Sequence, residues 1–346
     1  MSNTTPNLPG VDSLGRGAES PEQIPWRGWR QILHRTYSEM ISDRISMVAS
    51  GCAFWATLAL FPAISMLVSL YGLAFDPQTV EPQLATIRDL LPPAAYTLIA
   101  QRIDSLVRQG GGTLGLSLVL STLFALWSTA TGTKTLLTAL NMAYEEEERR
   151  SLLHFQLVGV AMTATIVVGA IVALAILVTL PFAIDFVGLG DYSQTLIKLA
   201  SVAVLVIFVL LLLSFVYRFG PCRRKAKWKW VTPGSVVATL LWLLASLLFS
   251  LYVGHLANYD STYGPLGAVA AVMMWFWVSA YAVLLGAELN SEMELQTVRD
   301  STEGPPKPMG ARGAYVADHV ASGDTPAVRH EDRQRKAQMK HAAAPP

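Results

Sequence analysis

The stretch LWSTATGTKTLLTALNMAYEEEERR, residues 126–150, passes within one helix's length from apolar residues through a series of threonines to four glutamates and two arginines. Such an ending is typical of a membrane-spanning helix that reaches water, but four carboxylates could also indicate a catalytic or metal site. Successive residues of a helix point about 100° apart, so only Glu145 and Glu148 share a face. His154 is the nearest imidazole, and no His-Glu-x-x-His pattern or cysteine pair accompanies it. The stretch therefore indicates the solvated end of a span, with the two arginines as ion-pair partners.

The composition points to the same class of protein. The chain has 346 residues, of which 52% are hydrophobic and 15% charged, and its mean hydropathy of +0.39 is too high for an ordinary soluble domain. Long runs contain no Asp, Glu, Lys or Arg, whereas the helices of a large soluble protein keep a charged face toward water. Each run exceeds the roughly 20 residues that cross a membrane. We predict an all-α membrane protein, a bundle of six transmembrane helices at about residues 45–73, 113–134, 155–182, 196–217, 232–257 and 264–287.

The distribution of cations predicts the orientation of the chain. Lys and Arg gather before the first span, after the second, between the fourth and fifth, and after the sixth, and such residues resist translocation. Both termini are therefore expected in the cytoplasm. The basic run RFGPCRRKAKWKW, residues 218–230, fits a cytoplasmic loop with an aromatic anchor better than a nucleic-acid patch, and the formal net charge is only +1. Cys52 and Cys222 are the two cysteines, and a structural disulfide between them is not expected.

The segments outside the spans have different expected structures. Residues 26–41 place aromatic and aliphatic residues at helical spacing opposite arginines, which predicts an amphipathic helix on the cytoplasmic leaflet or, alternatively, a helix docked on the bundle. Residues 76–111 predict a helical outer loop between the first and second spans. Residues 1–25 and 299–346 are rich in Pro, Gly and charge without periodicity, and are expected to be disordered. The transmembrane domain is thus expected over residues 26–298.

The threonine series suggests a polar stripe on the second span. Thr131, Lys134 or Thr135, Thr138 and Asn141 recur at spacings of three and four, so they share a face that should turn to the bundle interior. This stripe either holds helices together or lines a polar cavity in which Lys134 contacts an anionic group. At the end of the last span, Glu288 either pairs with Lys134 or lies in headgroup water. The candidate pathway residues are Thr131, Lys134, Thr135, Thr138, Asn141 and Glu288.

Other motifs limit the mechanism. Pro62 lies within the first span, where it removes a backbone donor and frees the carbonyl of Leu58, so a kink is expected. No Gly-x-x-x-x-Gly-Lys phosphate loop is present, no carboxylate lies mid-span, and His255 lies near an outer end. We expect no catalytic residue, no cofactor and no metal, and hence no enzyme.

Three separated stretches resemble one family of membrane proteins. They are AFWATLALFPAISMLVSLYG (53–72), the stretch at 126–150, and YGPLGAVAAVMMWFWVSAYAVLLGAELNSE (263–292). Together they resemble the YihY/BrkB family of bacterial inner-membrane proteins, over roughly residues 25–296. The resemblance implies a six-helix inner-membrane protein without agreed catalytic residues. Members were once labelled ribonuclease BN, which is regarded as a misassignment, and others are linked to serum resistance and to envelope lipid export.

The sequence patterns bear on three possible functions. A transporter or translocator of an anionic amphiphile or other envelope component is favoured by the polar stripe, the expected kink and the basic face. A non-transporting scaffold for envelope integrity or serum resistance would use the same helices only for packing. A tRNA-processing ribonuclease is disfavoured because the loops are short and lack an acid–base or metal set. The expected partners are membrane lipids, among them an anionic amphiphile, and no nucleic acid; the oligomeric state does not follow from these patterns.

Overall fold

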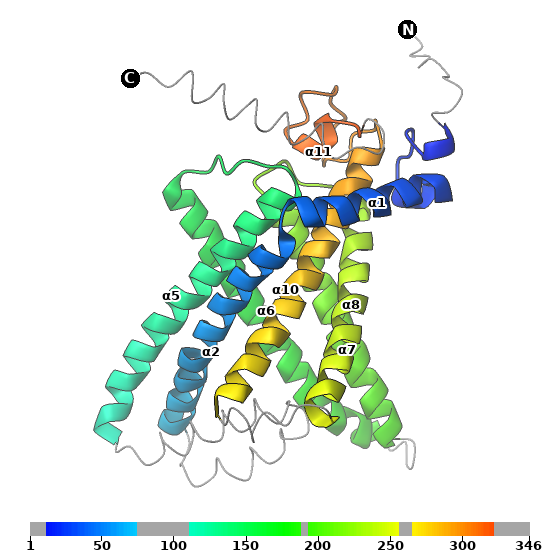
Figure 1. The fold of residues 1–346 in the computed structure, drawn as a ribbon. Coiled ribbons are helices and arrows are strands. Elements are labelled where there is room, and N and C mark those ends of the chain that lie inside the picture. The colour runs from blue at the N-terminus through cyan, green and yellow to red at the C-terminus, as the bar shows by residue number, and fades with distance from the viewer. Residues whose placement is uncertain (1–11, 75–110, 188–192, 256–264, 322–346) are drawn as a thin grey trace, which may run out of the picture.

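A computed structural model describes residues 12–74, 111–187, 193–255 and 265–321 (Figure 1). The helical outer loop expected at residues 76–111 therefore lies almost wholly outside the described residues. Within these ranges the chain is helical, and the only pairing of extended backbone is one isolated bridge between Ala226 and Thr302. The all-α class is confirmed.

The long helices lie at the predicted spans. They are α2 (Ile45–Ala74), α5 (Gly111–Ala143), α6 (Leu152–Val187), α7 (Ser193–Phe219), α8 (Trp228–His255) and α10 (Pro265–Gln296). The shorter elements are η1 (Asp12–Leu14), η2 (Pro21–Gln23), α1 (Trp26–Ser42) and α11 (Tyr315–Asp318). Both α5 and α10 continue past the predicted span ends, and this places Asn141 and Glu288 in ordered helix. Pro62 lies inside α2, which remains helical around it, and the kink stays a prediction.

Several helices are suited to a bilayer. Over their described residues α6, α7, α8 and α10 are long and apolar enough to cross a membrane, and α2 contributes a shorter apolar stretch, Ile45–Leu60. Large apolar side chains such as Val168, Leu211 and Leu248 are more than half exposed. Exposed apolar surface on this scale marks a face that another apolar phase covers. The chain is a multi-pass membrane protein.

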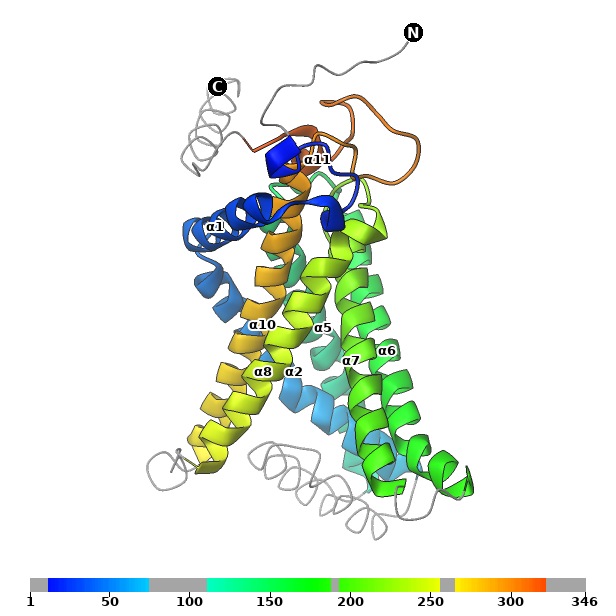
Figure 2. The same cartoon turned by 90° about the vertical axis from the view of Figure 1, so that its right-hand side faces the viewer.

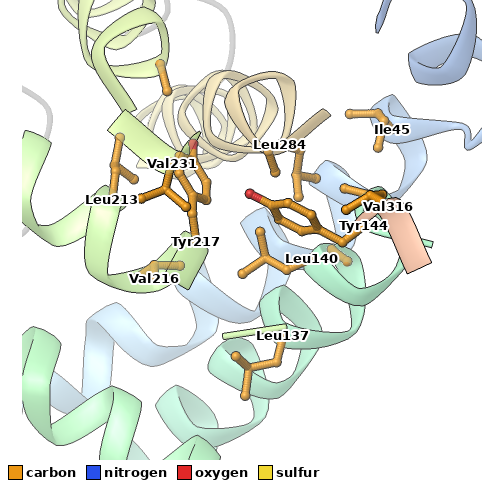
Figure 3. Packing of buried hydrophobic residues seen from close by; sticks show 14 of the residues in the cluster. Ile45, Leu137, Leu140, Tyr144, Leu213, Val216, Tyr217, Val231, Leu284 and Val316 are labelled. Carbon is orange, nitrogen blue, oxygen red and sulfur yellow. The ribbon is translucent and has the colours of Figure 1, made fainter. Parts of the chain in front are cut away.

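The long helices form a closed ring. In this ring α2 packs against α5 and α10, α8 packs against α10 and α7, and α6 packs against α7 and α5. Figures 1 and 2 show that α1 lies across one end of the ring, beside α11, and that the bundle is narrower at this end than at the other. We call it the α1 end. The buried apolar core, which includes Leu137, Leu140, Tyr217 and Leu284, lies there (Figure 3).

Two glycines allow α8 and α10 to cross closely at the α1 end. A Cβ atom added to Gly234 would overlap the Gly286 carbonyl oxygen, and one added to Gly286 would lie 2.5 Å from the Tyr217 hydroxyl. Asn290 of α10 uses this proximity: its Oδ1 accepts the Gly234 N–H at 2.8 Å, and its Nδ2 donates to the Val231 carbonyl at 3.1 Å. The amide thus satisfies backbone groups on both sides of a proline inside α8, as membrane helices require.

The segment after α10 is folded, which corrects the expectation of a disordered tail from residue 299. Residues 299–321 pack across the α1 end, where the Gly313 carbonyl accepts the Arg224 N–H and the Ser301 carbonyl accepts the Lys227 N–H, both at 2.9 Å. The buried Arg312 guanidinium donates to two backbone carbonyls of this segment and to that of Val298, just before it. One internal cation therefore orders a segment whose Pro- and Gly-rich composition suggested disorder.

The chain before α1 is also partly ordered, contrary to the expectation for residues 1–25. The Arg16 carbonyl accepts the Val298 N–H at 2.8 Å, and the Ala18 carbonyl accepts the Thr297 hydroxyl at 2.6 Å. Residues 12–25 are thus attached to the end of α10. Their order depends on partners that lie about 280 positions away in the chain, and a local pattern cannot reveal such partners.

Replacing Gly286 with Ala should separate α8 from α10. We expect the free energy of unfolding to fall by about 1–3 kcal/mol, as in other overpacked cores, read as a lower midpoint of thermal unfolding in detergent. Gly17→Ala is the matched control, because nothing lies within 4 Å of a Cβ atom at that position. Equal midpoints for the two variants would contradict the close crossing.

Candidate functional site at the α1 end

The threonines of the predicted stripe bond within their own helix. The hydroxyls of Thr131, Thr135 and Thr138 each donate to the backbone carbonyl four residues earlier in α5, at 2.8, 3.0 and 3.0 Å. The hydroxyl bond that joins two helices instead links Thr133 to Thr163 of α6, with 2.8 Å between the oxygens. Thr133 was missed because it lies one position away from the stripe. A hydroxyl that donates to its own helix keeps only acceptor lone pairs for a ligand.

Lys134 lies on a partly exposed face of α5. Positions 124, 127, 131, 134 and 138 recur at helical spacing, and on this face the side chains of Phe124 and Trp127 are 44% and 54% exposed. The stem of Lys134 lies against Gly159 of α6, since an added Cβ there would be 3.1 Å from the lysine Cγ. Lys134 forms no ion pair within the described part of the chain. The stripe thus shares its face with exposed aromatic side chains.

The suggested pair between Lys134 and Glu288 is not formed, and this corrects one of the two expectations for Glu288. The other expectation, placement in headgroup water, also fails, because the Glu288 side chain is only 2% exposed. It lies in α10 at the α1 end, whereas Lys134 lies between α5 and α6. The two side chains belong to different environments.

Asn141 is the stripe residue that connects separate elements. It is 4% exposed, and its Oδ1 accepts the Cys222 N–H at 2.7 Å while its Nδ2 donates to Glu148 Oε2 at 2.9 Å. Arg150 in turn donates to both Glu148 oxygens at 2.7 Å and to the Gly220 carbonyl at 3.2 Å. These bonds hold the α5–α6 connection against the α7–α8 connection.

The glutamates of the opening stretch act separately. Glu146 Oε1 accepts the Tyr315 N–H at 2.7 Å and so ties the tail to the end of α5. Partial burial opposes ionisation of Glu148, but hydrogen bonds from Arg150 and Asn141 outweigh it and lower the pKa of Glu148 to about 2. Among the described residues no three His, Cys, Asp or Glu side chains are grouped to hold a metal ion. The contacts of Glu146 and Glu148 described above join parts of the chain to one another.

A second buried network was not predicted. Arg223 Nη2 lies 2.6 Å from Glu294 Oε2, which also accepts the Ser301 hydroxyl at 2.5 Å. The guanidinium lies 4.9 Å from the centroid of the Tyr144 ring. Complete burial raises the pKa of the Tyr144 phenol, and Figure 3 shows its hydroxyl directed toward the side chain of Tyr217, with Leu284 nearby. In the sequence Arg223 is one of several cations in a basic loop and looks like a solvated residue. Only the burial of its side chain in the structure shows otherwise.

The docking of α1 on α10 buries polar groups. Arg35 Nε lies 2.6 Å from Glu292 Oε2, and its Nη2 donates to Gln296 Oε1 at 2.8 Å. The opposite face of α1 carries Trp26 and Tyr37, which are 70% and 69% exposed. The helix therefore docks through a charged face and turns an aromatic face outward, the reverse of a helix on the surface of a soluble protein.

Comparisons with known proteins agree with this architecture. The sequence profile of the family described as "Virulence factor BrkB" matches residues 36–310, which include every long helix and part of the packed tail. The chain belongs to the BrkB virulence-factor family. This confirms the resemblance inferred from the three motifs.

Relatives of this BrkB-family protein cover most of its length. A protein of Bacillus subtilis named as ribonuclease-like, YfkH, is 32% identical over 69% of this chain and 86% of its own. A UPF0761 membrane protein of Pseudoalteromonas translucida is 25% identical over 82% of this chain and 90% of its own, and one of Albidiferax ferrireducens is 26% identical over 76% and 62%. No solved structure matches the chain.

Replacing Asn141 with Ala should leave the Cys222 N–H and a lone pair of Glu148 without partners. We expect the free energy of unfolding to fall by about 1–3 kcal/mol, the usual cost of an unsatisfied buried group. Thr138→Ala, one turn earlier, removes an exposed hydroxyl and should change it by less than about 0.5 kcal/mol. Thermal unfolding in detergent compares the two, and an effect of Thr138→Ala as large as that of Asn141→Ala would argue against the network.

The ionised form of Glu148 should stabilise the fold in a defined pH window. Its pKa in the folded chain is about 2, below the ordinary value of about 4.3. The stabilisation is therefore complete above the ordinary value and is lost as the pH falls from about 4.3 toward 2. Glu148→Gln should lower the unfolding temperature near neutral pH and flatten its decline across this window. A decline as steep as in the unaltered protein would mean that other carboxylates cause it.

Proposed function

We propose that this BrkB-family protein is a six-span translocator of an anionic amphiphile in the bacterial inner membrane, with both termini in the cytoplasm. One observation carries the proposal: Lys134 has no ion-pair partner in the described chain and lies on the face of α5 where Phe124 and Trp127 are exposed. A cation above exposed aromatic side chains suits a molecule with an anionic head and an apolar tail.

The lengths of α2 and α5 support the count of six spans. These helices have 30 and 33 residues, and at about 1.5 Å per residue each exceeds the roughly 30 Å of a hydrocarbon core. They complete the ring with the four helices that meet the length and hydropathy requirements of a span. A ring with two of its members outside the bilayer would expose their apolar faces to water.

The position of α1 supports the placement of the membrane surface. It lies across the end of the bundle (Figure 2), and its outward aromatic residues are accompanied by Arg27 and Arg30. This combination favours the boundary between headgroups and acyl chains of an anionic leaflet. Because the cations of the chain concentrate at the same end, the leaflet is assigned to the cytoplasmic side.

The chemistry of the stripe limits how a headgroup is recognised. Thr131 and Thr138 donate their hydroxyl hydrogens to α5 itself, so the contact with an anion falls to the Lys134 ammonium. An ammonium is a flexible point charge and does not impose a planar, bidentate geometry. We therefore propose recognition by charge and by the apolar tail, with little discrimination between phosphate and carboxylate heads.

One observation favours the alternative, a non-transporting scaffold for envelope integrity. The networks around Asn141 and Arg223 join elements of this chain to one another, as a rigid support would require.

The name of the Bacillus subtilis relative suggests a nuclease, but here the guanidinium groups of Arg150 and Arg223 are paired with glutamates. We therefore propose that the chain is not an enzyme.

Removing the charge of Lys134 should remove the bound amphiphile. The full-length protein is extracted in mild detergent, and its co-purifying lipids are measured by mass spectrometry for the unaltered chain, Lys134→Met and Lys134→Arg. Methionine keeps a stem against Gly159 without the charge. We expect one anionic amphiphile to be enriched over bulk lipid and to fall about tenfold or more in Lys134→Met, the effect of losing one contact to a charged group.

Two controls decide the outcome. Lys134→Arg should retain the amphiphile, and Lys307→Met, which removes a cation from the exposed part of the tail, should leave it unchanged. If the unaltered protein and Lys134→Arg retain the amphiphile, the next experiment is a flux assay in liposomes that contain this amphiphile. Bulk lipid alone in every sample would favour the scaffold.

A further inference from the structure

A buried carboxyl group at the α1 end has no visible counter-charge. Glu288 of α10 is 2% exposed, and its Oε1 has no hydrogen-bond partner in the described part of the chain. No ion pair of the described residues includes it. Burying an ionised carboxylate without a partner costs on the order of several kcal/mol. Such a group commonly takes up a proton instead.

The neighbours of Glu288 increase this cost. Arg35, Glu39 and Asp43 follow one another at intervals of four along α1, and Glu288 and Glu292 are four apart on α10, so each set forms one row. The ion pair between Arg35 and Glu292, at 2.6 Å, fixes the two rows against each other. The rows then bring buried carboxylates of α1 alongside Glu288.

The charged groups that act most strongly on Glu288 are carboxylates. They are Asp43 and Glu39 from α1, Glu292 from α10 itself and Glu145 from the segment after α5. Two phenols also lie on this side: Tyr144 after α5, and Tyr217 of α7, whose hydroxyl donates to the Val283 carbonyl at 2.6 Å. The nearby cations Arg35 and Arg223 are paired with Glu292 and Glu294. Since α1 ends at Ser42, the negative end of its dipole also lies beside Asp43.

The arrangement suits a proton better than a metal ion. No group of three acidic, His or Cys side chains in the described ranges converges as metal ligands do. A proton needs no such convergence, and it removes the charge of a buried carboxyl group that has an unpartnered oxygen and no ion pair among the described residues. Glu288 lies near the C-terminal end of α10. It is therefore consistent with the observation that no carboxylate lies in the middle of a predicted span.

We propose that Glu288 is a proton-binding site whose carboxyl group is protonated while α1 is docked on α10 and gives up the proton when the two helices separate. The proton goes to water at the exposed rim of the α1 end, and no other bond is made or broken. Docking of α1 is then linked to pH: raising the pH favours separation by up to about tenfold per unit, because the docked form holds one proton more. The inference goes beyond amphiphile transport and does not depend on it.

Infrared spectroscopy of the full-length protein in nanodiscs tests the protonation directly. Near neutral pH we expect the C=O stretch of a protonated carboxylic acid, its absence in Glu288→Gln, and its persistence in Glu147→Gln, which alters an exposed carboxylate of the same end. Incorporating isotope-labelled glutamate should shift the band in the unaltered protein, which identifies it as glutamic acid even if Glu288→Gln folds poorly. Absence of the band, or its persistence in a folded Glu288→Gln, would overturn the proposal.

Hydrogen exchange of the α1 amides tests the consequence. After correction for intrinsic exchange, opening of α1 should increase with pH in the unaltered protein and in Glu147→Gln, and should be independent of pH in Glu288→Gln, which imitates the protonated form. If the opening of α1 in the unaltered protein did not depend on pH, the proposed link between docking and protonation would be refuted. The amphiphile measurement on Lys134 variants is separate, so failure of either proposal leaves the other intact.

Discussion

The close crossing of α8 and α10 is the contact on which the α1 end of the molecule depends. Gly234 and Gly286 allow the two backbones to meet, and Asn290 then bridges them through a backbone N–H and a carbonyl of α8. Because α10 is held close to α8 there, its next turns present Glu292 and Glu294 to Arg35 and Arg223 from other segments. Burial in the protein removes water from these groups, so they must satisfy one another.

Paired arginines and an unpaired lysine have different physical roles in the described part of this protein. Arg35, Arg150 and Arg223 form ion pairs with glutamates, and so they fasten separate segments of the chain. Lys134 forms no such pair with any residue that the structure describes, and it lies beside exposed apolar side chains of α5. The planar guanidinium suits the first task because it can donate to two acceptors at once, whereas an ammonium on a long stem suits contact with a headgroup. The proposed function rests on this difference.

The acidic groups divide in a similar way. Glu148, Glu292 and Glu294 accept bonds from arginines, and their charge therefore contributes to the fold. Glu288 is buried among other carboxylates, and its Oε1 accepts no bond from the residues that the structure describes. A proton satisfies this group while α1 covers it, which connects the docking of α1 to the pH of the compartment. The amphipathic helix and the bundle are thus joined through one row of charged side chains.

The sequence by itself determined the membrane class, the position of each long helix and the family. Long runs without charge and three ordered motifs are local features of the sequence, and local features are sufficient for these conclusions. It did not predict that residues 299–321 fold, or which polar residues of α5 connect helices. Thr133 rather than Thr138 reaches another helix, and Asn141 binds a loop 81 positions away. The tertiary structure decided these points because burial and pairing depend on partners distant in the chain, and a helical period defines a face without identifying what covers it.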